Sequence, residues 1–215
     1  EDEIRTGLKK GLATRGLFPV FCASTRKNIG VSRIMEFVVN SLPSPSDIEA
    51  PKTKEGKELK VDAAAPAVAF VFKTSIEPHL GEVSFLKLVS GEIAEGADLI
   101  NANKDGKERL SQLFAISGKN RTKLEKVVAG DIFATIKLRD TNTNHTLTTP
   151  KNASDILPKM EYPQPKHRTA IRAKNSSDEE KLGALLKQLH QIDPTLLVEQ
   201  RSEERRVGKE CRSRW

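Results

Sequence analysis

Apolar and polar residues alternate most regularly in the middle of the chain, over residues 67–149. Short runs with a period of two, which is typical of strands with one buried face, are separated by turn residues such as Pro78 and Gly81. Asp105-Gly106 lies between two of these runs and favours a tight hairpin turn. The predicted strands are 68–72, 83–89, 98–101, 107–116, 132–138 and 145–147. This pattern predicts a small antiparallel β-barrel, with Phe70 or Phe72 as an anchor of its core.

The chain before this block has the pattern of an α/β structure. Residues 17–22 form a continuous apolar run, which is typical of a parallel strand buried on both faces. Residues 31–42 then show helical spacing, and we expect this helix to pack on the sheet with Met35 in the core. Between them lies the loop Ala23-Ser24-Thr25, at the carboxyl end of the predicted strand, where open α/β sheets bind ligands. A strand-to-helix loop without a ligand is the alternative.

The segments on either side of the predicted barrel are polar and rich in proline. Residues 44–65 contain hardly any aliphatic anchor, which indicates a linker or a mobile insert. After a second polar stretch, residues 167–173 alternate like a strand, and Ser177 with Glu180 forms a capping box ahead of a leucine-rich helix that reaches Gln191. A further short strand is predicted at 196–198. Strand, helix and strand in this order make half of a ferredoxin-like unit.

Charge adds a candidate binding surface to this picture. The 215 residues carry a formal net charge of +7, which favours an anionic partner such as RNA. Lys119, Arg121 and Lys123 lie in the predicted loop after Ile116, where a group of cations could contact phosphates. A solvated loop is the alternative. No apolar run approaches the ~20 residues of a transmembrane helix, so we expect no membrane partner and a cytoplasmic location.

The two cysteines, Cys22 and Cys211, lie in different segments, so the sequence indicates neither a disulfide framework nor a metal site. Because the chain begins with Glu1 and enters at once on a helical pattern, we expect it to be a fragment of a longer protein.

Three blocks of this sequence, in order, resemble elongation factor G, the GTP-driven ribosomal translocase. The barrel block is S-I-E-P-H-L-G-E-V-S-F-L-K-L-V-S-G-E-I at 75–93 with A-G-D-I-F-A at 129–134. The end of the factor's GTPase domain resembles P-V-F-C-A-S at 19–24, K-N-x-G-V at 27–31 and L-P-S-P at 42–45. The start of its third domain resembles D-E-E-K-L-G at 178–183 and D-P-T at 193–195. The resemblance ends at about Gln200.

The resemblance implies a multidomain fold: α/β, then β, then α+β. We expect residues 1–48 to be the C-terminal part of a GTPase domain, 49–65 a linker or mobile insert, and 66–150 the β-barrel second domain. Residues 151–165 would be a linker and 166–200 the first half of a ferredoxin-like third domain. Residues 201–215 match nothing in the family and are expected to be a non-native tail.

The resemblance also implies a function, GTP-dependent movement of tRNA and mRNA through the ribosome by a monomeric factor that binds ribosomal RNA. Backbone N–H groups of Ala23, Ser24 and Thr25 would contact guanine, although the family usually has Gly and Ala where this chain has Ala23 and Thr25. The intact factor would use GTP with magnesium. The chain itself has no phosphate-binding loop or Asn-Lys-x-Asp motif, so we expect it to be inactive alone. The alternatives are a ribosome-protection or recycling GTPase and a non-catalytic RNA-binding barrel.

Overall fold

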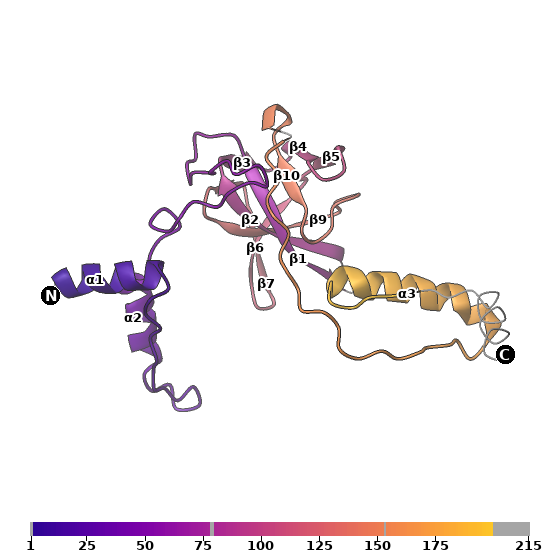
Figure 1. Cartoon of the computed structure of the whole chain (residues 1–215), viewed down its shortest axis with the longest axis horizontal. Helices are drawn as coiled ribbons and strands as arrows, with labels where there is room; N and C mark the ends of the chain where they lie inside the picture. The colour runs from indigo at the N-terminus through magenta and orange to yellow at the C-terminus, as the bar shows by residue number, and fades with distance from the viewer. Residues whose placement is uncertain (1, 78–79, 153, 200–215) are drawn as a thin grey trace, which may run out of the picture.

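The computed structural model of the chain describes residues 2–77, 80–152 and 154–199. A β-rich body lies in the middle, with two helices on its N-terminal side and one on its C-terminal side (Figure 1). The helices are α1 (Asp2–Ala13), α2 (Val31–Ser41) and α3 (Glu179–Ile192), with short 3₁₀ turns η1 (Pro150–Asn152) and η2 (Ser176–Asp178). Among the described residues, none of these helices is long and apolar enough to cross a membrane.

Antiparallel strands build the central body. In the described residues they are β1 (Val68–Glu77), β2 (Gly81–Ser90), β3 (Glu92–Ala94), β4 (Asp98–Asn101), β5 (Gly106–Arg109), β6 (Leu113–Ser117), β7 (Asn120–Leu124), β8 (Lys126–Val128), β9 (Ile132–Ile136) and β10 (Thr146–Thr148). The large sheet has the order β5-β4-β10-β1-β2-β9-β6-β7, and β3 pairs with β8 in a small second sheet.

One core connects all parts of this body, so the sheets wrap around it as a barrel. Its buried side chains include Leu99 from β4, Leu86 from β2, Leu113 from β6 and Val127 from the small sheet. Alternation along each strand places these residues inward, as the sequence predicts. The anchor differs, however. Phe133 is 1% exposed, whereas Phe70 and Phe72 are only half-buried, so the predicted anchors are corrected.

Phe72 lies on the outer face of the sheet, at a local irregularity of β1. The register of β1 against β2 shifts between Val71 and Lys73, so the residue between them belongs to a bulge. The ring of Phe72 lies 6.4 Å from that of Phe85, which projects from the outer face of the sheet. Phe70 and Phe72 both lie on the face opposite to the core that Ala69 and Val71 enter, so the period of two is correct here and the face assigned to the core was wrong.

The predicted strands are otherwise confirmed, with two further differences. The run 107–116 divides into β5 and β6, and β3, β7 and β8 were not predicted. The hairpin between β4 and β5 has residues 102–105 in its turn, and of the Asp-Gly pair only Asp105 has a positive φ, 53°. The turn is thus longer than the two-residue type that the pair suggests.

The outer face of the sheet carries a second apolar cluster, which the flanking segments cover. Leu59 and Leu157 are buried there against Val68, Val89 and Phe70. Residue 54 donates its N–H to the carbonyl of Ile156 at 2.8 Å. The two predicted linkers, 49–65 and 151–165, are therefore attached to the barrel at Leu59 and Leu157, so the part of the expected mobile insert around Leu59 is packed.

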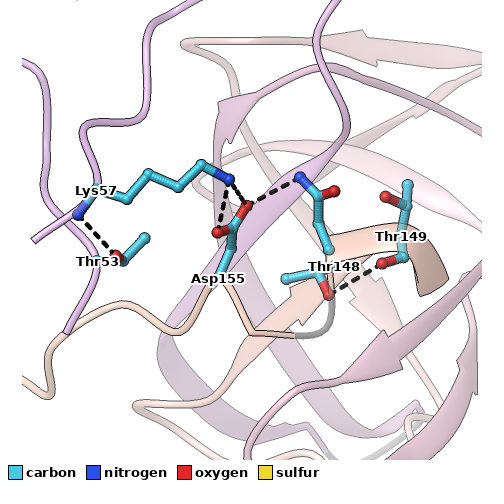
Figure 2. A network of polar contacts seen from close by, with 6 residues as sticks. Thr53, Lys57, Thr148, Thr149 and Asp155 are labelled. Carbon is cyan, nitrogen blue, oxygen red and sulfur yellow. Dashed lines mark hydrogen bonds and ion pairs between the residues drawn. The ribbon is translucent and has the colours of Figure 1, made fainter. Parts of the chain in front are cut away.

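An ion pair joins the same two segments (Figure 2). Lys57 Nζ contacts both carboxylate oxygens of Asp155, at 2.8 and 2.7 Å, and the side chain of Asn152 donates to one of them at 2.9 Å. The backbone N–H of Lys57 donates to the hydroxyl of Thr53 at 3.1 Å. Asp155 is buried, so the interaction with Lys57 and Asn152 satisfies a carboxylate that would otherwise be costly to bury.

Gly91 lies where the segment before β1 approaches the barrel closely. Its φ is +80°, and a Cβ at this position would lie 2.5 Å from the Cα of Ala67. Its N–H donates to the carbonyl of Asp62 at 2.8 Å. Both the conformation and the close approach require glycine.

The N-terminal part differs from the α/β prediction. Residues 17–22 are extended but belong to none of the described strands, and Phe18 and Val20 are 78% and 91% exposed. Met35, predicted to lie in the core, is 58% exposed. Helix α2 lies against α1 and does not pack on the sheet, and Phe21 meets Phe37 edge to face with 5.0 Å between ring centroids. A buried strand needs neighbours on both sides, and the described residues supply none.

The C-terminal part forms its predicted helix but not its predicted strands. Residues 167–173 and 196–198 belong to no strand in the described part of the chain. Helix α3 begins at Glu179, and its Leu185 and Leu189 remain exposed. The ferredoxin-like prediction is therefore met only by the helix. The predicted tail, 201–215, lies outside the described residues.

Candidate functional site

The cations predicted in a loop belong to a hairpin. Strands β6 and β7 pair from Leu113 with Leu124 to Ser117 with Asn120, so Gly118 and Lys119 form a two-residue turn. Gly118 has a φ of +60°, as such turns require. Lys119 lies at the tip of the hairpin, while Arg121 and Lys123 lie within β7, which corrects the predicted loop.

Each of the two strand cations has an acidic partner from elsewhere in the barrel. Arg121 forms an ion pair with Glu77 at the end of β1, and Lys123 Nζ lies 2.9 Å from a carboxylate oxygen of Glu95, which follows β3. Lys119 is exposed and has no ion-pair partner among the described residues. Within that part of the chain, the hairpin therefore presents a single unpaired cation, at its tip.

Aromatic and aliphatic side chains lie beside these cations. The register places Phe114 opposite Lys123 and Ile116 opposite Arg121, so each pair shares the outer face of the sheet. Phe114 and Ile116 pack against the buried residues Val83, Ala134 and Ile136. The ammonium of Lys73 lies 5.5 Å from the centroid of the Phe85 ring on the same face. Cations thus border a small apolar cluster over β2, β9 and β6.

The loop predicted to contact guanine is closed by two backbone hydrogen bonds. The N–H of Ser24 donates to the carbonyl of Ile29 at 3.0 Å, and the N–H of Ile29 donates to the carbonyl of Ser24 at 3.0 Å. Gly30 follows with a φ of +80°, and a Cβ there would lie 3.0 Å from the carbonyl oxygen of Cys22. The loop is therefore a tight turn that leads directly into α2.

These bonds decide which amides could serve a ligand. The N–H of Ser24 is already used, whereas within the described part of the chain those of Ala23 and Thr25 donate to no acceptor. Two free donors two residues apart could bind a carbonyl oxygen. The loop precedes α2 and the hairpin belongs to the barrel, and the structure does not bring them together into one site (Figure 1).

A buried polar network in the barrel was missed by the sequence reasoning. Glu108 is 3% exposed and accepts hydrogen bonds from the N–H of Arg139 at 3.0 Å, the N–H of Asp140 at 2.8 Å and the hydroxyl of Thr141 at 2.8 Å. These contacts join β5, at one edge of the sheet, to the segment after β9. The sequence feature that could have indicated this network is a glutamate, Glu108, at an inward position of a strand.

His145 extends this network. Its Nδ1 accepts the N–H of Asn142 at 3.1 Å and lies 3.0 Å from the amide nitrogen of Asn101. Burial lowers the pKa of His145, and the nearby Lys104 and Lys159 lower it further, while Glu108 acts in the opposite direction. Nδ1 is thus an acceptor in the neutral ring, and protonation would place a third donor among its neighbours.

The described residues contain no candidate metal-binding site. Over the ranges 2–77, 80–152 and 154–199, no group of three or more His, Cys, Asp or Glu side chains is placed to hold a metal ion. The hairpin cations and the two amides of the loop are the candidate binding groups.

The barrel matches a protein-family model. Residues 66–150 match the family model of elongation factor G domain 2. The chain is also similar to the crystal structure of a protein from Thermus thermophilus designated ttk003000868, with a TM-score of 0.74 and 28% sequence identity. The similarity covers 94% of this chain and 28% of that one, so the chain spans less than a third of its length. It therefore extends beyond the barrel into both flanking parts.

Proposed function

We propose that this chain, which resembles elongation factor G-like translational GTPases and contains their second domain, is part of a factor that moves tRNA and mRNA through the ribosome with GTP. The observation that carries the proposal is the match over the whole barrel together with structural similarity over 94% of the chain. In this proposal residues 1–48 belong to the GTPase domain and 166–200 to a ferredoxin-like domain. The exposed apolar side chains of both parts, such as Val20 and Leu185, would then be covered by the rest of those domains.

The barrel would dock on ribosomal RNA through the β6–β7 hairpin. Lys119 supports this role because it is exposed at the tip of a paired hairpin and has no competing acid among the described residues. Arg121 and Lys123 are on the same hairpin but already hold carboxylates. Backbone phosphates are the ligands such cations bind, and the net charge of +7 favours the encounter.

GTP with magnesium would be bound by the whole factor. This chain would contribute the loop before α2, where the free N–H groups of Ala23 and Thr25 fit the carbonyl oxygen of guanine, whereas that of Ser24 does not while its internal bond persists. The chain's own part would be to contact the base through this loop and to join the GTPase domain to the barrel. The phosphate-binding loop is absent from this sequence.

Cosedimentation with purified ribosomes tests the docking role. Wild-type chain should bind at low salt, and K119E should weaken binding several-fold because one attractive contact becomes repulsive. K107E is the matched control, since Lys107 is an exposed lysine on β5, at the opposite edge of the sheet order from β7. Equal loss in both variants would mean that net charge alone drives binding, and no loss in K119E would remove the hairpin from the interface.

The same experiment separates the proposal from a non-catalytic RNA-binding barrel. Binding to ribosomes that is matched by equally tight binding to unrelated duplex RNA would favour the latter. A preference for ribosomes that is lost in K119E would support the proposal that the chain is part of a ribosomal factor.

A further inference from the structure

The two ion pairs of β7 lie next to each other on one side of the strand. Arg121 and Lys123 are two residues apart in one strand, so they lie on the same side of it and about 6.6 Å apart along its axis. Their partners come from different places, Glu77 from the end of β1 and Glu95 from the segment after β3. The hairpin is therefore held against the barrel at two neighbouring points by acids that are not part of it.

Both pairs are accessible to a competing anion. The side chains of Arg121 and Glu77 are about one third exposed, and that of Lys123 is more than half exposed. Pairs at such exposure are weakly held, because water screens the attraction. A phosphate group can therefore replace the carboxylate, but it must also approach a negative charge that repels it.

We infer that Glu77 and Glu95 act as internal competitors for RNA phosphates and set how many cations the hairpin offers. The inference rests on the proposed function. With both pairs closed, the hairpin offers Lys119 alone. With both open, it offers three cations, one at the tip and two on one side of β7.

This arrangement favours a particular kind of RNA. A single phosphate gains little by opening one pair, since it exchanges one weak contact for another. An RNA that first binds Lys119 brings further phosphates close to Arg121 and Lys123, so their exchange becomes intramolecular and is favoured by a high local concentration. Glu77 and Glu95 thus select against isolated phosphates and for an extended phosphate backbone.

The barrel contains a matched control pair. Lys126 Nζ lies 2.6 Å from a carboxylate oxygen of Glu92, and both residues belong to the small β3–β8 sheet, not to the hairpin. The change E92Q alters the net charge by the same amount as E77Q or E95Q. It also frees one lysine, but outside the proposed RNA-binding side of β7.

Fluorescence anisotropy with labelled double-stranded RNA at several KCl concentrations tests the inference on the full chain. E77Q and E95Q should each tighten binding about 2- to 5-fold, the range expected when one exposed ion pair no longer competes. The slope of log affinity against log salt should steepen by almost one unit for each cation that gains a phosphate. E92Q should change neither quantity.

The outcomes separate this inference from the proposed function. If K119E weakens binding but E77Q and E95Q behave like E92Q, Glu77 and Glu95 do not compete with RNA phosphates. The docking role of the hairpin is then still supported. If K119E has no effect, the hairpin is not the interface and the docking role is wrong. Glutamine keeps a carbonyl oxygen that accepts from Arg121 or Lys123, so the hairpin should remain folded. E77D and E95D, which keep the charge, should retain the wild-type slope and serve as second variants if a glutamine variant unfolds.

Discussion

Replacing Glu108 by alanine should destabilise the barrel more than any surface change on the same strand. The carboxylate accepts three hydrogen bonds, from the N–H groups of Arg139 and Asp140 and the hydroxyl of Thr141. Hydrogen bonds to a charged group are worth about 1.5–3 kcal/mol each, although they are not additive when one group makes all three. Because water reaches the exposed residues 139 and 140 in the variant, we expect a loss of about 3 kcal/mol rather than the full sum.

Two further variants of β5 should lose less stability than E108A. In E108Q one amide oxygen can still accept from Asp140 and Thr141, while the amide nitrogen faces the N–H of Arg139, so the loss should be about 1–2 kcal/mol. K107A changes a neighbouring exposed side chain on β5 and should stay within about 0.5 kcal/mol of wild type.

Urea unfolding of the full chain, followed by far-ultraviolet circular dichroism, measures these losses. A lower midpoint with an unchanged slope would report lost stability rather than a changed unfolded state. In thermal unfolding, 3 kcal/mol corresponds to a fall of about 12 °C or more for a barrel of this size. If E108A were no less stable than K107A, the contacts between β5 and the segment after β9 would not hold the barrel closed.

Four further outcomes are expected. F133A should cost about 3–5 kcal/mol in urea unfolding because its ring is fully buried, and F72A should cost less because its ring is half exposed. G91A should lower the melting temperature by several degrees or more, since its positive φ costs about 1 kcal/mol for alanine before the clash with the backbone of Ala67. Stability should fall as the pH drops below about 6.5, because the lowered pKa of His145 lets the unfolded chain take up the proton first, and H145Q should reduce this dependence. Titration of the chain with a fluorescent GTP analogue should give no micromolar binding, because the sequence lacks the phosphate-binding loop that supplies most of the roughly 8 kcal/mol required.

The barrel could be predicted from the sequence because the alternation of its strands and the residues of its turns can be recognised in short stretches of the chain. Alternation in β1 and β2, and the turn signals between strands, correspond to buried and exposed positions in the structure. The exceptions arise where local rules compete with packing. Strands β3 and β8 are short and pair only with each other, so neither has a recognisable period. Phe70 and Phe72 were misplaced because a period of two does not tell which face of β1 is buried in the main core.

The flanking segments could be predicted less well, for two different reasons. The stretch around Leu59 contains few apolar residues and resembles a linker, yet that single leucine and Leu157 are enough to anchor two segments on the barrel. The run 17–22 is apolar enough for a buried strand, but a strand forms only beside other strands. In the first case packing came from a partner far along the chain, and in the second the described residues contain no partner.

The sequence alone does not tell which of the candidate RNA-binding side chains are already paired with acids. Lys119, Arg121 and Lys123 look equivalent in the sequence, and only the fold distinguishes them. The partner of Arg121 is 44 residues away, at the end of a strand that the sheet order separates from β7 by three others. A basic cluster therefore predicts how much cationic charge a segment carries, whereas the acids brought to it by the barrel decide how much of that charge a phosphate can reach. For this hairpin the difference is between three cations and one, which is why its affinity for RNA should depend on Glu77 and Glu95 as strongly as on the cations themselves.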